Sequence, residues 1–568
     1  MEKFCDKGPK APQDPTKKRS YIYILLNQMI ESIERGHDVF SSEIYLDSER
    51  LMNKIEVVGQ VTDDTMKKLV TTCTGFKKLV HSIGITVSDA SESYMVTCGL
   101  MTYGSKIRDD GSRFEIICPS DGSEHLLSLV DQEWGSDDAV IGQMYFRFPK
   151  PALTAEVSVR LFLHDGYTVP DLCVDPPVDW ESEAYVEMVS KSCISTGNTL
   201  RVKKALLHSQ RGEDVTIAFI GGSITQGAGA VPNQTECYAY KFYRWFQQRY
   251  CSDPTKCHYI KAGIGGTSSE LGLVRYEKDI EQFGLIQPDI VFVEFAVNDN
   301  GDETEGVCHE SLIATILKKK WNPAVIMVLS VFANDWNLQD RLIPIGKRYH
   351  VPMVSILDAV VPQFHPKNTA DCVITKRQYF YDMFHPTNEG HTIMADCLKH
   401  LFVSIDRQET TATDINLEIS PAIGREYIHM HYVDRAVSDK NVLINIGGFS
   451  QVDRDLQAVE RDKGSKLIPQ FINNWMYDKN SEGGDYNIDL NCHALFLIMK
   501  DSGNQDFGKV PIFVDGKYFK IIDPLLVGWT HCNAILVIPY KRILTHHVVS
   551  LHMVDTSKCF TILGWSWN

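Results

Sequence analysis

The chain has 568 residues, of which 43% are hydrophobic and 23% charged. This composition is that of a globular protein, and the length is too great for a single core. The formal net charge of −16 argues against a nucleic-acid partner, because phosphates would be repelled. No segment reaches the roughly 18 to 20 apolar residues of a membrane span, and residues 1–20 lack the apolar core of an export signal. We therefore expect a cytoplasmic protein that binds neither membranes nor nucleic acids.

The cysteines indicate a reducing environment. There are 15 of them, an odd number, scattered from Cys5 to Cys559 without a C-x-x-C pair. Extracellular proteins usually pair their cysteines, and zinc sites need clustered ligands, so we expect free thiols and no metal site. The sequence leaves the oligomeric state open, a homo-oligomer included.

The N-terminal part is predicted to contain two segments. Residues 1–90 are mixed: "YIYILLNQMI" (21–30) predicts a buried helix, and apolar residues recur at helical spacing between Met66 and Ile83. Short alternating runs between 92 and 165 predict an antiparallel sheet. We therefore place a mixed α/β segment at 1–90 and a β-rich accessory domain at 91–190, ending in a proline-rich link.

Residues 195–405 alternate between apolar strands and helical patterns, which predicts an α/β domain with a parallel sheet covered on both faces. Its strands are expected at "TIAFIGG", "HYIKAG", "DIVFVEFAV", "AVIMVLSVF" and "VPMVSIL". Beyond residue 420 the runs are again strand-like, and Asp515-Gly516 marks a two-residue hairpin turn. We predict a C-terminal β-sandwich accessory domain at 420–568.

The segment "TIAFIGGSITQGAGA" (216–230) ends a predicted strand in two glycines and a serine. A phosphate loop would need lysine where Ala228 stands, and a dinucleotide fingerprint would need glycine in place of Pro232. The G-x-S-x-G nucleophile elbow is excluded by Thr225. A nucleophilic Ser223 remains open, provided that other strand ends supply a base, a group that orients it and donors for an oxyanion.

The other strand ends contain such residues. Glycines, among them Gly266, follow the second strand, and Asn298 follows the third. Asp382 and His385 stand three residues apart before the last predicted helix, so the carboxylate can hold one ring nitrogen while the other faces Ser223. Each residue alone has a structural explanation as a helix cap, a turn residue or a helix start. His365, also followed by proline, lacks a carboxylate three residues before it.

Together these motifs resemble the SGNH hydrolase superfamily, also called GDSL-like esterases, over roughly residues 212–403. The resemblance implies a flavodoxin-like parallel sheet with helices on both faces, flanked here by β-sandwich or jelly-roll-like regions. It also implies Ser223 as nucleophile, His385 as base and Asp382 as its partner. The oxyanion hole would consist of the Ser223 N–H, the Gly266 N–H and the Asn298 side chain. No metal or organic cofactor is implied.

The sequence departs from the family pattern in two motifs. Gly-Gly-Ser-Ile replaces Gly-Asp-Ser-Leu, which resembles the carbohydrate-esterase branch, and Lys261 stands where an asparagine often opens the glycine block. We therefore expect a serine esterase that removes short acyl groups, mainly O-acetyl, from oligosaccharides. Trp336, Trp529 and Trp565 are candidates for stacking on sugar rings. A lipid ester or thioester hydrolase, a non-catalytic carbohydrate-binding protein and an acetyl transferase remain alternatives.

Overall fold

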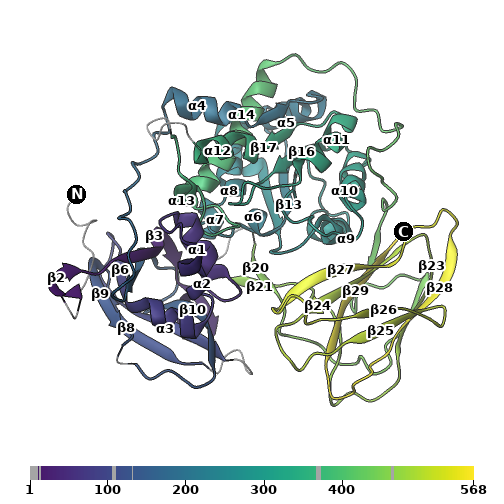
Figure 1. The fold of residues 1–568 in the computed structure, drawn as a ribbon. Helices are drawn as coiled ribbons and strands as arrows, with labels where there is room; N and C mark the ends of the chain where they lie inside the picture. The colour runs from purple at the N-terminus through teal and green to yellow at the C-terminus, as the bar shows by residue number, and fades with distance from the viewer. Residues whose placement is uncertain are drawn as a thin grey trace.

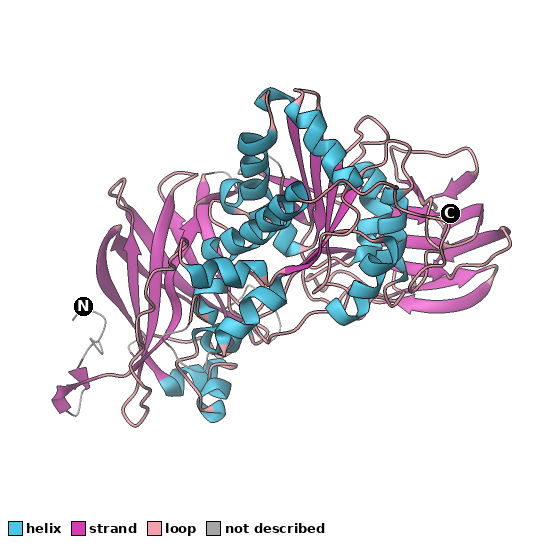
Figure 2. Cartoon of the chain, turned by 90° about the horizontal axis from the view of Figure 1, so that it is seen from above, coloured by secondary structure: helices cyan, strands magenta, loops and turns pink. Residues whose placement is uncertain are grey.

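The structure is a computed structural model, and it describes residues 10–11, 14–36, 38–104, 111–130, 132–365, 372–461 and 466–568. A helix-covered central domain lies between an N-terminal and a C-terminal β region (Figure 1). Seen from above, the helices gather in the middle of the molecule, with strands toward either end (Figure 2).

The N-terminal region is a sandwich of two antiparallel sheets around one apolar core. The five-stranded sheet has the order β4 (Ile33–Gly36), β5 (Val39–Tyr45), β10 (Asp138–Phe148), β7 (Met95–Gly104), β8 (Arg113–Pro119). The four-stranded sheet has the order β3 (Tyr21–Glu31), β11 (Thr154–Leu163), β6 (Val80–Ser88), β9 (Asp121–Ser128). A separate pair, β1 (Lys10–Ala11) and β2 (Asp14–Lys18), precedes them. Because both sheets combine strands from either side of residue 90, the expected boundary there runs through this sandwich.

The prediction of a helix at 21–30 was wrong, because this segment is strand β3. Its side chains are buried on both faces: Ile22 and Ile24 point into the sandwich core, whereas Tyr21 and Tyr23 pack with Phe162 on the other side. A strand covered on both faces has no polar alternation, and its continuous apolar run therefore imitates a buried helix.

The helical spacing from Met66 to Ile83 is confirmed only in part. Two short helices, α2 (Asp64–Leu69) and α3 (Cys73–Leu79), are followed directly by β6. The Thr72 hydroxyl accepts the N–H of Gly75 at 3.1 Å and so starts the second helix. Together with α1 (Arg50–Val58), these helices pack on the N-terminal sandwich.

The central domain contains the expected sheet. Its order is β12 (Cys193–Ser195), β17 (Met353–Ser355), β16 (Ala324–Leu329), β15 (Ile290–Glu294), β13 (Val215–Gly221), β14 (Cys257–Gly263), and all but β12 are parallel. Alternate side chains of β13 enter different cores: Phe219 belongs to one apolar cluster and Ile220 to the other.

Helices cover both faces of this sheet, as the alternating pattern predicts. One face packs against α5 (Leu200–Gln210), α8 (Tyr238–Tyr250), α12 (Ile356–Phe364) and α14 (Asn388–Arg407). The other packs against α9 (Ser269–Asp279), α10 (Val307–Leu317) and α11 (Gln339–Tyr349). The carboxyl ends of the parallel strands therefore lie at one edge, where ligands bind in open α/β sheets.

The C-terminal region is a second antiparallel sandwich with its own core. One sheet has the order β18 (His431–Val433), β29 (Phe560–Trp567), β24 (Leu495–Asp501), β27 (His531–Ile538), with β22 (Trp475–Tyr477) also pairing to β29. The other has the order β19 (Val442–Asn445), β23 (Tyr486–Cys492), β28 (Thr545–Leu551), β25 (Val510–Val514), β26 (Lys517–Ile522). The predicted hairpin is confirmed: β25 and β26 pair around Asp515-Gly516, both of which have positive φ.

The two flanking regions contact the central domain. Side chains of β24 and β27 belong to the same apolar cluster as α9 and α10, so one sheet of the C-terminal sandwich packs on that helical layer. A small hairpin, β20 (Ala458–Glu460) and β21 (Leu467–Pro469), extends from this sandwich toward the central domain (Figure 1). The described cysteines are free thiols. In the described part of the chain, every helix is too short or too polar to cross a membrane.

Candidate active site

Ser223 lies at the turn from β13 into the short helix α6 (Ser223–Gln226). The two glycines before it are required by close contacts rather than by flexibility. A Cβ atom on Gly221 would lie 2.2 Å from Thr225 Oγ1, and one on Gly222 would lie 2.1 Å from Asn298 Oδ1. This packing holds the turn tightly against the ends of β13 and β15.

The structure brings Ser223 together with His385 and Asp382. His385 Nε2 lies 2.9 Å from Ser223 Oγ, and His385 Nδ1 lies 2.9 Å from Asp382 Oδ2. The other carboxylate oxygen, Oδ1, accepts the backbone N–H groups of Phe384 and His385, each at 2.8 Å. Asp382 thus shapes the turn that carries His385 and orients its ring. The imidazole side chain remains 21% exposed, so a substrate can reach the site from solvent.

The electrostatics keep Asp382 ionised. Burial alone would raise the pKa of this carboxyl, but it lies well below its ordinary value because His385 pairs and hydrogen-bonds with it and the Lys54 ammonium is nearby. An ionised Asp382 accepts a hydrogen bond from the His385 Nδ1–H, which keeps the proton on Nδ1 and leaves the Nε2 lone pair facing Ser223.

The expected oxyanion donors flank Ser223. A Cβ atom on Gly265 would lie 3.6 Å from Ser223 Cβ, so the glycine loop after β14 lies beside the serine. Gly265 donates its N–H to Gln226 Oε1 at 2.9 Å, whereas Gly266 is exposed with a φ of +74°. Asn298 follows β15, and its amide packs against Gly222. The arrangement thus gathers Ser223, Gly266 and Asn298 at one strand edge.

The C-terminal sandwich holds this glycine loop, which sequence reasoning missed. Gln457 Nε2 donates to the Gly265 carbonyl at 2.8 Å, and His531 Nε2 lies 3.0 Å from the Gly266 carbonyl oxygen. His531 Nδ1 in turn lies 2.9 Å from Asp501 Oδ2. No local motif marks these residues, because their function depends on a domain contact across about 200 positions of the chain.

The predicted tryptophans lie at different distances from the site. A Cβ atom on Gly266 would lie 2.9 Å from the Trp529 ring, so Trp529 borders the glycine loop. Trp336 packs on Phe332 with 6.0 Å between ring centroids, and Phe332 packs on the exposed Phe384 at 5.0 Å. A chain of two ring contacts, through Phe332 and Phe384, thus leads from Trp336 toward His385.

Two other candidates lie elsewhere. Trp565 is fully buried in the core of the C-terminal sandwich, where its Nε1 donates to Tyr486 OH at 3.1 Å, so the expectation that it could stack on a sugar was wrong. His365 is exposed and lies 2.6 Å from Asp335 Oδ2. Of the two histidines that precede a proline, His385 is the one whose ring lies within hydrogen-bond distance of Ser223.

Two buried ionisable residues, Lys261 and Glu294, contact the turn that contains Ser223. Lys261 donates to the Gln226 carbonyl at 2.8 Å and to Asn233 Oδ1 at 2.6 Å, so the lysine that departs from the family pattern ties down the end of α6. Glu294 accepts hydrogen bonds from Thr225 Oγ1 at 2.9 Å and Ser330 Oγ at 2.8 Å. Burial raises the pKa of Glu294 to about 7, although both hydrogen bonds lower it. A lone acidic residue within the apolar run "IVFVEF" is the sequence signal for this contact.

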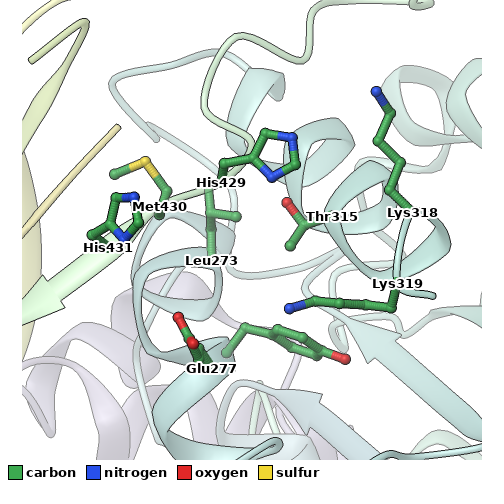
Figure 3. A pocket seen from close by; sticks show the side chains of 9 residues that line it. Leu273, Glu277, Thr315, Lys318, Lys319, His429, Met430 and His431 are labelled. Atoms are coloured by element: carbon green, nitrogen blue, oxygen red, sulfur yellow. The ribbon is translucent and has the colours of Figure 1, made fainter. Parts of the chain in front are cut away.

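A cavity of about 220 Å³ lies apart from these residues, between α9, α10 and the segment that leads into β18. Lys318, Lys319, His429 and His431 are among its lining side chains (Figure 3). Lys319 Nζ is paired with Glu281 at 2.7 Å. Ser223, Asp382 and His385 do not line this cavity. Within the described ranges, no group of three or more His, Cys, Asp and Glu side chains is arranged to hold a metal ion.

Fold and site together define an SGNH-type hydrolase domain. Residues 219–393 match the model of the GDSL-like Lipase/Acylhydrolase family. The chain thus contains a GDSL-like acylhydrolase domain, and its enzyme class is that of the carboxylic ester hydrolases. No match was found among curated proteins.

Two solved structures resemble a large part of the chain. One is a two-domain esterase (CEX) active on acetylated mannans, with 24% identity and a TM-score of 0.56, covering 67% of this chain and 98% of its own. The second, the same kind of esterase co-crystallised with mannopentaose, has 25% identity and a TM-score of 0.55, covering 67% and 97%. About a third of the present chain has no counterpart in these matches.

The buried Glu294 predicts a pH-dependent stability. Its pKa is about 7 in the folded protein against an ordinary value of 4.5, so folding loses stability as the pH rises between these values, by at most about 3 kcal/mol. Glu294→Gln removes this loss. We expect the thermal transition temperature of the variant, relative to the parent, to be higher at about pH 8 than at about pH 5. An equal difference at both values would contradict the shifted pKa.

Proposed function

We propose that the protein is a serine esterase that removes short acyl groups, mainly O-acetyl, from carbohydrates. The observation that carries this proposal is the continuous chain of hydrogen bonds from Ser223 Oγ through the His385 ring to Asp382, with both distances at 2.9 Å. A serine hydroxyl becomes nucleophilic only when a neighbouring base accepts its proton. A protein that only binds carbohydrate does not need such a base. Ser223 is therefore the proposed nucleophile, His385 the base and Asp382 its orienting partner.

The reaction proceeds in two acyl transfers. Ser223 Oγ attacks the ester carbonyl carbon while its proton moves to His385 Nε2, and the resulting tetrahedral intermediate collapses as His385 returns that proton to the leaving sugar hydroxyl. Water then attacks the acyl-serine, losing a proton to His385, and the intermediate releases acetate while the proton returns to Ser223. Asp382 stays ionised throughout and stabilises the imidazolium.

The negative charge on the carbonyl oxygen needs preorganised donors. We assign this role to the backbone N–H groups of Ser223 and Gly266 and to the Asn298 amide. The first lies at the free N-terminal end of α6, where backbone N–H groups have no partner within the helix. The second lies on a loop fixed by Gln457 and His531, so it does not have to reorganise during the reaction.

A carbohydrate substrate is supported by two observations. A structure with 25% identity and a TM-score of 0.55 is that of an esterase active on acetylated mannans, co-crystallised with mannopentaose. Aromatic rings also border the site from two sides: Trp529 next to Gly266, and Phe384 with its ring centroid 6.1 Å from that of His385. Flat apolar faces of this kind suit sugar rings, whose C–H groups pack on them while the hydroxyls stay in water.

Replacing the nucleophile and one oxyanion donor tests the mechanism. Ser223→Ala removes the attacking atom and should abolish nearly all hydrolysis of 4-nitrophenyl acetate. Asn298→Ala removes one donor and should lower kcat by about 100- to 1000-fold. Initial rates across substrate concentration measure both effects.

Ser557→Ala, on an exposed turn of the C-terminal sandwich, is the matched control and should retain the parent rate. If Ser223→Ala folds normally and hydrolyses the ester at the parent rate, Ser223 is not the nucleophile.

Acyl length and sugar type test the substrate class. We expect acetate release from acetylated manno- or xylo-oligosaccharides, and 4-nitrophenyl esters should be cleaved progressively more slowly from acetate to octanoate. Trp529→Ala should raise KM for the oligosaccharide by about 10-fold, the loss expected for one aromatic contact. Trp180→Ala, a partly exposed tryptophan in the link before the central domain, should not. A preference for octanoate would favour the lipid or thioester hydrolase instead.

A further inference from the structure

The N-terminal sandwich reaches the candidate active site through Lys54, a residue of α1 that is only 3% exposed. Its ammonium donates to the backbone carbonyl oxygen of Tyr381 at 3.2 Å and lies 3.9 Å from the centroid of the Tyr381 ring. In the part of the chain that the structure describes, no carboxylate lies within ion-pair distance of Lys54 Nζ. Burying an ammonium with only these partners costs folding free energy. Its position next to the turn of Asp382 and His385 therefore indicates a role beyond folding.

The Tyr381 carbonyl oxygen that Lys54 contacts lies directly before Asp382 in the chain. It belongs to the peptide group that joins Tyr381 to Asp382, so holding it fixes the plane from which the Asp382 side chain projects. The N–H of Tyr381 donates to the carbonyl of His385 at 2.8 Å and closes the same turn from the other side. Lys54 therefore holds the backbone oxygen of the peptide that directly precedes Asp382, the residue that orients the imidazole of His385.

A second contact nearby shows that α1 is seated firmly. Arg377, on the short helix α13 (Lys376–Tyr379) just before the turn, donates to the Val58 carbonyl at the end of α1 at 3.3 Å. Its guanidinium also pairs with Asp175 of the link between the domains at 2.5 Å. Both ends of the segment from α13 to Asp382 are thus held by residues outside the acylhydrolase domain.

The charge of Lys54 acts in the same direction as its hydrogen bond. Burial lowers the pKa of Lys54 to about 8, opposed by the charge of Asp382, so the side chain is mostly protonated at neutral pH. The ammonium in turn contributes, after His385, to the low pKa of Asp382. A cation at this place favours the ionised carboxylate that the imidazole needs as its partner.

We propose that Lys54 is a positioning residue for the esterase reaction, which fixes the Tyr381–Asp382 peptide from the N-terminal sandwich and so aligns His385 with Ser223. The N-terminal sandwich is then a part of the catalytic unit and not only an appended module. This inference rests on the function proposed above. It concerns the rate of the chemical step and not the affinity for the substrate, because Lys54 lies behind the triad turn and is shielded from solvent.

The test uses the full-length protein with Lys54→Met, which keeps an unbranched side chain one atom shorter but removes the charge and the donor. At about pH 7 we expect kcat for 4-nitrophenyl acetate to fall by about 10-fold with KM unchanged, as for an interaction expressed only in the transition state. Lys54→Arg keeps a cationic donor and should recover most of the rate. Lys77→Met is the control, because it removes an exposed cation of α3 that lies over the Trp134 ring in the same N-terminal region.

The thermal transition of each variant separates loss of folding from loss of positioning. If Lys54→Met does not fold, the assay is repeated with Lys54→Gln. Unchanged kcat in a folded Lys54→Met or Lys54→Gln variant would overturn the inference, as would an equal loss in Lys77→Met or a failure of Lys54→Arg to recover the rate. These outcomes differ from failure of the proposed function, in which the parent protein itself would show no hydrolysis dependent on Ser223.

Discussion

The hydrogen bond between Ser223 Oγ and His385 Nε2 is the contact on which the candidate site depends. It joins residues 162 positions apart in the chain. The parallel sheet makes it feasible, because β13 delivers the serine to the carboxyl edge and α14 begins at the same edge just after His385. Close packing of Gly221 and Gly222 against the neighbouring strand ends leaves the serine turn little freedom to move. In this structure the two side chains already lie within hydrogen-bond distance.

Both flanking sandwiches contact loops at the sheet edge where Ser223 and His385 meet. The C-terminal sandwich holds the carbonyls of Gly265 and Gly266 through Gln457 and His531, and the N-terminal sandwich holds the turn of Asp382 through Lys54. In each case a side chain from a flanking region binds a backbone carbonyl of a loop at the candidate site. Loops carry function but are mobile unless restrained, and here the restraint comes from outside the acylhydrolase domain.

Much of the central domain and the site could be predicted from the sequence, because strand ends and motif spacing are local features. The five parallel strands, the serine turn and the Asp382–His385 pair all lie in segments whose pattern is readable without a partner. The strand at 21–31 was predicted as a helix, because burial on both faces removes the alternation that identifies a strand. Lys54, Gln457 and His531 were missed for a different reason: their neighbours are set by domain contacts, which no local pattern records.

The central claim is that the His385 base makes the Ser223 hydroxyl nucleophilic. Its most direct test is covalent labelling of the full-length protein with a fluorophosphonate, followed by mass spectrometry of the proteolytic peptides. The account predicts one phosphonylated residue, Ser223, and strongly slowed labelling in His385→Ala. Labelling of a different serine, or labelling of Ser223 that is as fast in His385→Ala as in the parent, would contradict it.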